Sequence, residues 1–172
     1  MATRAEIAGL GWRRRSLSRA EGDHRVNDLV GPVKPPIWFW AAAVLGLAWN
    51  VFGVVQFLGS INPTAESLAA RGMTPDQAAV YMSIPAWMNI AFAIGVFGGL
   101  IGSGLLLMRK SAARQVLLAS LAGYIVLYIG DITHGVFAAL GAPQIIILTI
   151  VVAIAAALLW LAHATWKRGH LA

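Results

Sequence analysis

The sequence predicts an all-α membrane protein with four transmembrane helices, both termini in the cytoplasm, and a short extracytoplasmic helical cap. Of the 172 residues, 59% are hydrophobic and only 12% are charged, whereas a soluble domain carries about 25% charged residues. The mean hydropathy is +0.73. Four apolar segments each exceed the roughly 20 residues that a helix needs to cross the hydrocarbon core.

The amino-terminal segment, residues 1–36, is polar and basic and shows no long hydrophobic periodicity. We interpret it as a cytoplasmic tail that is flexible or is ordered by a partner. The first span is expected over residues 37–59. Pro35 and Pro36 stand directly before it, where a missing amide proton costs a helix little.

Residues 60–83 separate the first two spans and are expected to form a small helical cap on the outer face. A first short helix is expected before Gly72. The run Thr74-Pro75-Asp76-Gln77 then matches a helix start with an N-cap, a proline in the first turn and a capping-box glutamine. Pro85 lacks a backbone donor and should bend the chain where the cap meets the second span.

The other spans are expected over residues 84–108, 113–140 and 143–166, and residues 167–172 form a short cytoplasmic tail. The tight connection at residues 141–143 predicts an antiparallel hairpin of the last two spans.

Glycines stand out in the second span. Gly95 and Gly99, and Gly98 and Gly102, form two overlapping pairs of small residues four positions apart, which permit close approach of helix backbones. The neighbour is another helix of this chain, a second copy or a partner protein. We favour the internal contact.

The basic residues predict the orientation. If four spans alternate, Arg71 alone of the 13 Lys and Arg residues falls on one side, and the other twelve fall on the opposite side. The positive-inside rule then places both termini in the cytoplasm. The formal net charge of +6 is therefore an orientation signal, and we expect no nucleic-acid partner. Four tryptophans gather at the inner boundary, as an aromatic belt does: Trp38, Trp40, Trp160 and Trp166.

Polar residues inside the spans are the candidate site. An ionised Asp131 costs about 2.5–3.5 kcal/mol at mid-span, and His134 lies three residues further on the same helix face. Gln56, Asn89 and Asn50 bring amide groups from other spans. This cluster beneath the outer cap could bind a polar ligand or a proton. The alternative is that these side chains only hold helices together, through hydrogen bonds worth about 0.6 kcal/mol each.

No catalytic, metal or cofactor site is expected. Asp131 is the only acid in any span, and the chain shows neither a phosphate loop nor a nucleophile with a nearby base. Asp131 and His134 lack a third strong metal ligand, and there are no cysteines. One haem cannot bridge His134 and His163, which would differ in depth by roughly 25 Å. We therefore do not expect an enzyme.

Spaced motifs across residues 40–130 carry a resemblance: Trp49-Asn50-x-x-Gly53-x-x-Gln56-Phe57, Met73-Thr74-Pro75-x-Gln77, Pro85-x-Trp87, Ala91-Phe92-Ala93, Val96-Phe97-Gly98-Gly99 and Arg109-Lys110. In these motifs the chain resembles a family of small bacterial four-helix inner-membrane proteins that are sometimes labelled sugar transporters. The resemblance implies a multi-pass protein of the bacterial cytoplasmic membrane and gives a weak hint of transport.

Two functions follow as hypotheses. The first is a non-enzymatic accessory subunit that docks onto a larger membrane assembly through its glycine-rich face and its amino-terminal tail. The alternative is a small-solute transporter, or a ligand-binding or proton-binding protein, that uses the cluster around Asp131. Expected partners are the lipid bilayer and either another membrane protein or a second copy of the chain.

Overall fold

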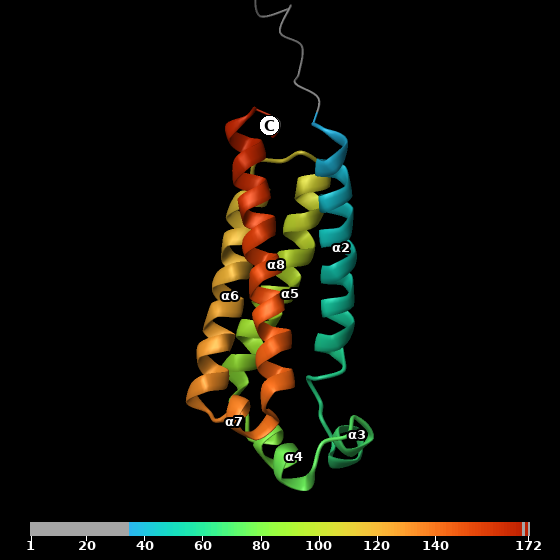
Figure 1. Ribbon diagram of the computed structural model, residues 1–172, viewed down its shortest axis with the longest axis vertical. Coiled ribbons are helices and arrows are strands. Elements are labelled where there is room, and N and C mark those ends of the chain that lie inside the picture. The colour runs from blue at the N-terminus through green and yellow to red at the C-terminus, as the bar shows by residue number, and fades with distance from the viewer. Residues whose placement is uncertain (1–34, 170, 172) are drawn as a thin grey trace, which may run out of the picture. The chain divides into compact units, whose positions relative to one another are not determined.

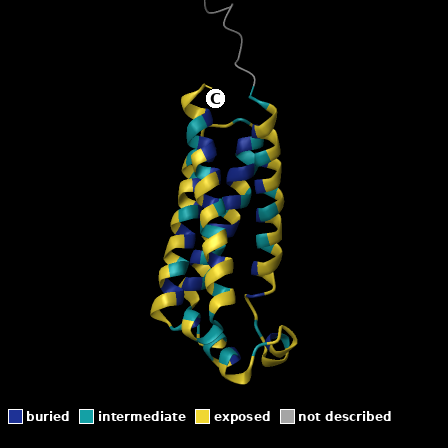
Figure 2. Ribbon diagram, in the orientation of Figure 1, coloured by how far each residue is buried: buried dark blue, intermediate teal, exposed yellow. Residues whose placement is uncertain are grey.

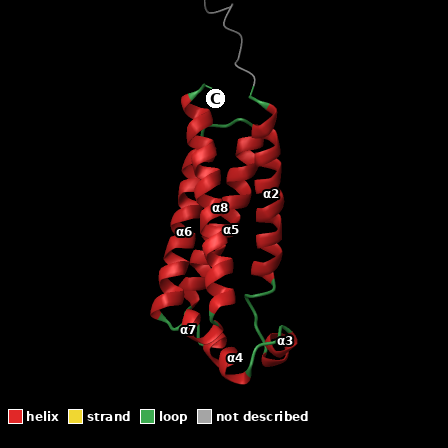
Figure 3. Ribbon diagram, viewed as in Figure 1, coloured by secondary structure: helices red, strands yellow, loops and turns green. Residues whose placement is uncertain are grey.

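The computed structural model describes residues 35–169 and residue 171, and every structural statement below concerns these residues. The predicted amino-terminal tail therefore lies outside the described residues, except for Pro35 and Pro36. The described residues form helices and short connections, without a strand (Figure 3).

Four long helices run alternately up and down in one bundle (Figure 1). They are α2 (Ile37–Leu58), α5 (Ala86–Leu107), α6 (Ala113–Thr133) and α8 (Ala142–Lys167). Each is long and apolar enough to cross a membrane. The predicted fold class, an all-α multi-pass membrane protein with four spans, is confirmed.

The bundle has two chemically different ends. The end that carries the 109–114 connection and the carboxyl terminus holds five cations, and we name it the inner end after the predicted orientation. The opposite end, named the outer end, carries three short helices (Figure 1). Exposed residues lie along all four long helices (Figure 2). Many of them are large and hydrophobic, including Ile37, Leu45, Ile90, Ile147 and Trp160. A lipid-facing surface has this composition.

The third predicted span, residues 113–140, is divided. Helix α6 ends at Thr133, and α7 (Val136–Leu140) follows after Gly135, whose φ of 70° is left-handed. An unbroken helix of 28 residues would measure about 42 Å, more than the roughly 30 Å of the hydrocarbon core. The glycine lets the chain turn at the outer end before α8 begins.

The cap contains α3 (Ala65–Ala70) and α4 (Pro75–Met82). The capping box predicted for α4 is confirmed: the Thr74 backbone amide donates to Gln77 Oε1 over 3.0 Å, and the Gln77 amide donates to Thr74 Oγ1 over 3.3 Å. Gln77 Nε2 also donates to the carbonyl oxygen of Ala139 in α7 over 3.0 Å. The side chain that closes the α4 terminus therefore also fastens the cap to the bundle.

The glycine-rich face of α5 packs inside the chain. Gly95, Gly98 and Gly102 all face side chains of α6. At Gly123 of α6 the two backbones themselves come close, because an added Cβ would lie 2.8 Å from the carbonyl oxygen of Ala91 and 2.8 Å from the amide nitrogen of Gly95. This face is therefore occupied by α6 and is not the free docking surface that one of our hypotheses required.

The inner half of the bundle is filled by a hydrophobic core in which the helices interlock. Its buried members come from α2, α5, α6, α8 and the carboxyl-terminal residues: Phe39, Ala43, Leu106, Ala113, Leu117, Leu158, Leu161, Ala162 and Leu171. The outer half is packed differently, and the candidate site lies there.

Candidate functional site

A cavity of about 420 Å³ lies between the outer halves of the four spanning helices and beneath the cap. Apolar side chains form most of its wall. Its polar lining comes from every spanning helix and from the cap: Gln56, Ser60, Arg71, Tyr81, Asn89, Asp131 and Gln144. We call this space the outer cavity.

Asp131 is the most deeply buried polar group of the outer cavity, with an exposed fraction of 2%. It lies in the last turn of α6, where Gln144 Nε2 of α8 donates to its Oδ2 over 2.9 Å. Among the described residues, no fully buried side-chain oxygen lacks a hydrogen-bond partner. Gln144 bonds only to Oδ2, so the other oxygen, Oδ1, has no hydrogen-bond partner in the part of the chain that the structure describes and is not fully buried. The bond from Gln144 orients a carboxylate that lines the outer cavity.

The cap contributes the positive charge. Arg71 follows directly after α3, and its Nη2 donates to the carbonyl oxygen of Gly59 at the end of α2. This bond fixes the guanidinium at the cavity wall and leaves its other N–H donors free to bind an anion. Arg71 is exposed, so it lies where the cavity approaches the outer surface.

Tyr81 of α4 lies within the electric field of both charges. Burial raises the pKa of the Tyr81 phenol, and this effect outweighs the charge of Arg71 and a hydrogen bond with the Ser60 side chain, which lower it. The charge of Asp131 raises the pKa of Tyr81 further. The phenol of Tyr81 is therefore neutral at neutral pH, able to donate or accept a hydrogen bond.

Aromatic and aliphatic side chains complete the wall. Phe52 of α2, Phe92 of α5, Tyr124 of α6 and Val151 of α8 all border the cavity. The ring of Tyr124 lies directly over Gly95, where a Cβ would come within 2.7 Å of it. The missing side chain at Gly95 therefore sets where the aromatic wall stands.

Of the five residues predicted to cluster, three line the outer cavity: Gln56, Asn89 and Asp131. They come from α2, α5 and α6. The antiparallel arrangement brings these distant sequence positions to the same depth.

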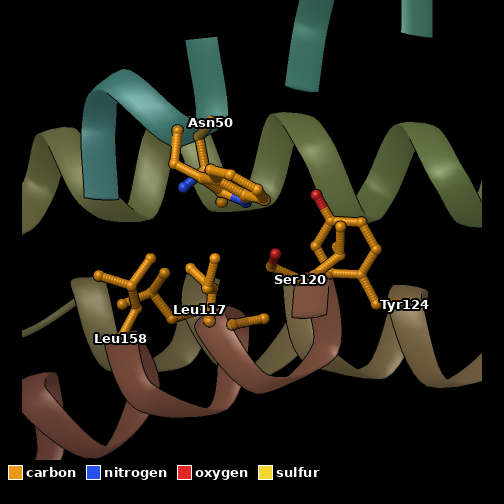
Figure 4. A pocket seen from close by; sticks show the side chains of 10 residues that line it. Asn50, Leu117, Ser120, Tyr124 and Leu158 are labelled. Carbon is orange, nitrogen blue, oxygen red and sulfur yellow. The ribbon is translucent and has the colours of Figure 1, made fainter. Parts of the chain in front are cut away.

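Asn50 lies deeper and has a packing role. Its Nδ2 donates to the Gly46 carbonyl oxygen over 2.7 Å and to Ser103 Oγ over 3.3 Å, which links α2 to α5. Gly99 provides the space, because a Cβ there would overlap the Asn50 carboxamide. Asn50 borders a separate hollow of about 10 Å³, shown in Figure 4 with Ser120. This is about the smallest space that holds one water molecule.

His134 does not share the face of Asp131. The helix ends at Thr133, so the spacing of three residues no longer places both side chains on one face. The His134 Nδ1 instead hydrogen-bonds to the Gly130 carbonyl oxygen over 3.1 Å, and its ring lies edge-on to Trp87 with centroids 5.5 Å apart. His134 is exposed outside the cavity, and the position expected for it beside Asp131 is taken by Gln144.

Arg71 and Gln144 line the outer cavity but were not foreseen from the sequence as lining residues. The sequence could have indicated a role for Arg71, because it is the only Lys or Arg residue that the predicted alternation of spans places on the outer side. Tyr81 and Gln144 lie in segments just beyond the membrane core, where polar residues are ordinary. The fold of the cap brings Tyr81 into the site, and the start of α8 after α7 brings Gln144 beside Asp131.

The described residues contain no group of three His, Cys, Asp or Glu side chains close enough to bind a metal ion. What the outer cavity offers is hydrogen-bonding groups, one negative charge, one positive charge and an apolar wall.

Comparisons with protein-family models, with curated proteins and with solved structures find no match to this chain. The resemblance to small bacterial inner-membrane proteins therefore stays a prediction, and the case for a function depends on the geometry of the outer cavity.

Proposed function

We propose that this protein is a non-enzymatic, multi-pass membrane protein that binds a small solute in the outer cavity, as a transporter or a solute-binding protein. The observation that carries the proposal is the buried carboxylate of Asp131, which is 2% exposed, lines a cavity of about 420 Å³ and has one of its two oxygens bonded to Gln144. Ligand pockets commonly measure about 300–1,000 Å³. An ionisable residue within a transmembrane helix indicates a functional site.

A purely structural role for Asp131 explains less of the site. A hydrogen bond between Gln144 and Asp131 would link α6 to α8 without any cavity beside it. Gln56 and Asn89 also line the space, although they belong to two other helices. Polar groups from four helices around one void fit a solute better than they fit a packing contact, which would fill the void.

The cap supports binding from the outer side. Arg71 and Gln77 fasten it to the ends of α2 and α7, so that it covers the cavity. Arg71 is also exposed, which gives a solute in the outer medium a charged group to meet first.

The experiment that tests the proposal uses the absence of cysteine in the chain. Asn89→Cys places a thiol at the cavity wall, and the matched variant Ile90→Cys places one on the lipid-facing side of the same helix, where the wild-type residue is 61% exposed. Both are treated with a hydrophilic, membrane-impermeant thiol reagent from the outer side. Because the reactive species is the thiolate, which hydrocarbon disfavours, we expect Asn89→Cys to react about tenfold faster. An unreactive Asn89→Cys would show that the cavity is closed to water and would contradict the proposal.

A second candidate, an accessory subunit of a larger membrane assembly, is favoured by the weak burial of α2. Only 17% of the most apolar stretch of α2 is buried within the chain, whereas 39% of the corresponding stretch is buried in α5 and in α6. With the glycines of α5 occupied by α6, the docking face would be the side of α2 that carries Val44, Val51, Val55 and Leu58, all exposed and at helical spacing.

Purification from native membranes in a mild detergent tests this second candidate. Co-purification of a larger complex that is lost in a Val51→Ala, Val55→Ala double variant would support docking through α2. A homogeneous small particle in both proteins would contradict it. Cross-linking of that particle then shows whether the partner is a second copy.

A further inference from the structure

We propose that the solute of the outer cavity is a small zwitterion, a molecule that carries an amine and an acid group on one apolar body. The inference rests on the proposed function and names the chemical class of its ligand. It comes from the two charges of the cavity lining, from the elements that carry them, and from the apolar wall that forms the rest of the cavity.

The charge inventory is balanced. Arg71 and Asp131 are the charged residues of the lining, and its other polar groups are neutral amides and hydroxyls. A ligand with a single charge would satisfy one of these residues and oppose the other. A ligand with both charges meets a complementary group at each end, and like-charge placements are avoided.

Asp131 is the group that receives the amine. A carboxylate as buried as this one needs a partner of opposite charge or several hydrogen-bond donors. The structure supplies one donor, from Gln144 to Oδ2, so an ammonium group at Oδ1 would complete the site. An ammonium group carries three donors and no acceptor, and it could also bond to neutral oxygens of the lining.

Arg71 is the group that receives the acid. Its guanidinium presents a planar set of donors that matches a carboxylate in a two-point contact. One of its nitrogens, Nη2, bonds to the Gly59 carbonyl oxygen, which orients the group without using its remaining donors. Tyr81 also lines the cavity and adds a hydroxyl group that can donate or accept a hydrogen bond.

The apolar wall of the outer cavity favours an apolar body for the part of the ligand that carries no charge. Phe52, Phe92 and Val151 border the cavity together with Tyr124, which lies two helical turns deeper in α6 than Asp131. A volume of about 420 Å³ admits a compact organic solute. The apolar wall disfavours a solute that is polar throughout, because its hydrogen bonds to water would not be replaced.

Three ligands of matched shape test the inference with the full-length protein in lipid nanodiscs. Phenylalanine carries both charges, phenethylamine carries only the amine, and 3-phenylpropionate carries only the acid. Equilibrium binding of radiolabelled phenylalanine, with the other two as competitors, ranks their affinities. We expect phenylalanine to bind at least about tenfold more tightly than either analogue, a factor that corresponds to 1.4 kcal/mol.

Two variants assign the ends of the ligand. Asp131→Asn should lower the affinity for phenylalanine and phenethylamine and leave that for 3-phenylpropionate unchanged or higher. Arg71→Gln should lower the affinity for phenylalanine and 3-phenylpropionate and leave that for phenethylamine unchanged or higher. Size-exclusion profiles that match the wild type ensure that these effects come from the site and not from loss of folding.

The outcomes separate the two proposals. Phenethylamine that binds as tightly as phenylalanine would make this a cation site and would overturn the inference. If none of the three ligands binds while Asn89→Cys still reacts with the hydrophilic reagent, the zwitterion is excluded and the proposed solute site stands. If Asn89→Cys is also unreactive, both proposals fail.

Discussion

The interface between α5 and α6 and the interface between α2 and α8 are built in opposite ways. In the first, glycines face the partner helix, and a Cβ at Gly123 would lie 2.8 Å from backbone atoms of α5. In the second, Leu158 of α8 packs against Gly46 of α2, but the helices also leave space at both depths: the outer cavity, and an apolar groove of about 460 Å³ in the inner half that Trp38 and Trp160 border. Close packing of one helix pair thus coexists with an open seam in the other, and the candidate site lies in the open seam.

The residues of the candidate site come from helices that differ in how tightly they are packed. The closely packed pair carries Asp131 on α6 and Asn89 on α5, so these groups stand on a rigid support. Helix α2 contributes Gln56, yet it is the least buried span. A solute that is held between the two would contact a fixed charge on one side and a weakly held helix on the other.

The largest expected effect comes from adding one methyl group to the closely packed interface. In Gly123→Ala the new Cβ meets the Ala91 carbonyl oxygen and the Gly95 amide nitrogen, backbone atoms that cannot rotate away. We expect the free energy of unfolding to fall by about 1–3 kcal/mol. The matched control is Gly104→Ala on α5, which meets nothing within 4 Å. Chemical unfolding in detergent measures both, and equal stabilities would contradict the description of α5 and α6 as closely packed.

A smaller loss is expected where the outer cavity connects α6 to α8. Gln144→Leu removes the donor to Asp131 Oδ2 and leaves the buried carboxylate without this bond. We expect a loss of up to about 1.7 kcal/mol, the largest value typical for hydrogen bonds between membrane helices. The control is the double variant Gln144→Leu, Asp131→Asn. Its loss should be smaller than the sum of the two single losses, and strict additivity would show that the two side chains do not interact.

Local patterns predicted much of this fold. The run from Thr74 to Gln77 contains all the residues of a helix N-terminus, so its capping box could be predicted without knowledge of any tertiary contact. The small residues Gly95 and Gly98 predicted a close approach of backbones, which is found against α6, whereas Gly99 makes room for the Asn50 side chain. The hydropathy of the sequence predicted the positions of the four spans, because every helix that crosses the hydrocarbon core needs about 20 apolar residues.

The parts that could not be predicted depend on where the chain turns. Gly135 adopts a left-handed conformation just after α6, so His134 leaves the helical register that had placed it beside Asp131. Gln144 occupies that place because α7 and the turn at Gly141 set the start of α8. Helical spacing predicts neighbours within one helix, and it contains no information on which residue of another helix will arrive there.

A further, smaller effect tests the link between α2 and the closely packed pair. Ser103→Ala removes the oxygen that accepts the Asn50 side-chain amide over 3.3 Å. Asn50 keeps its bond to the Gly46 carbonyl oxygen, so we expect a loss of only about 0.6 kcal/mol, the average for such a bond in membranes. Ser111→Ala, an exposed serine in the inner connection, is the control. A loss above that expected for Gln144→Leu would mean that α2 is held as firmly as α6.

The smallest effect should come from the same glycine-to-alanine change in the open seam. Gly53 of α2 lines the outer cavity, and a Cβ there would lie 3.7 Å from Val96, an ordinary van der Waals distance. We expect Gly53→Ala to change the free energy of unfolding by less than about 0.5 kcal/mol. Its methyl group would instead take up space at the cavity wall, so phenylalanine affinity should change while stability does not. A loss as large as that of Gly123→Ala would show that α2 is packed as tightly as α6, and the seam would then hold no room for a solute.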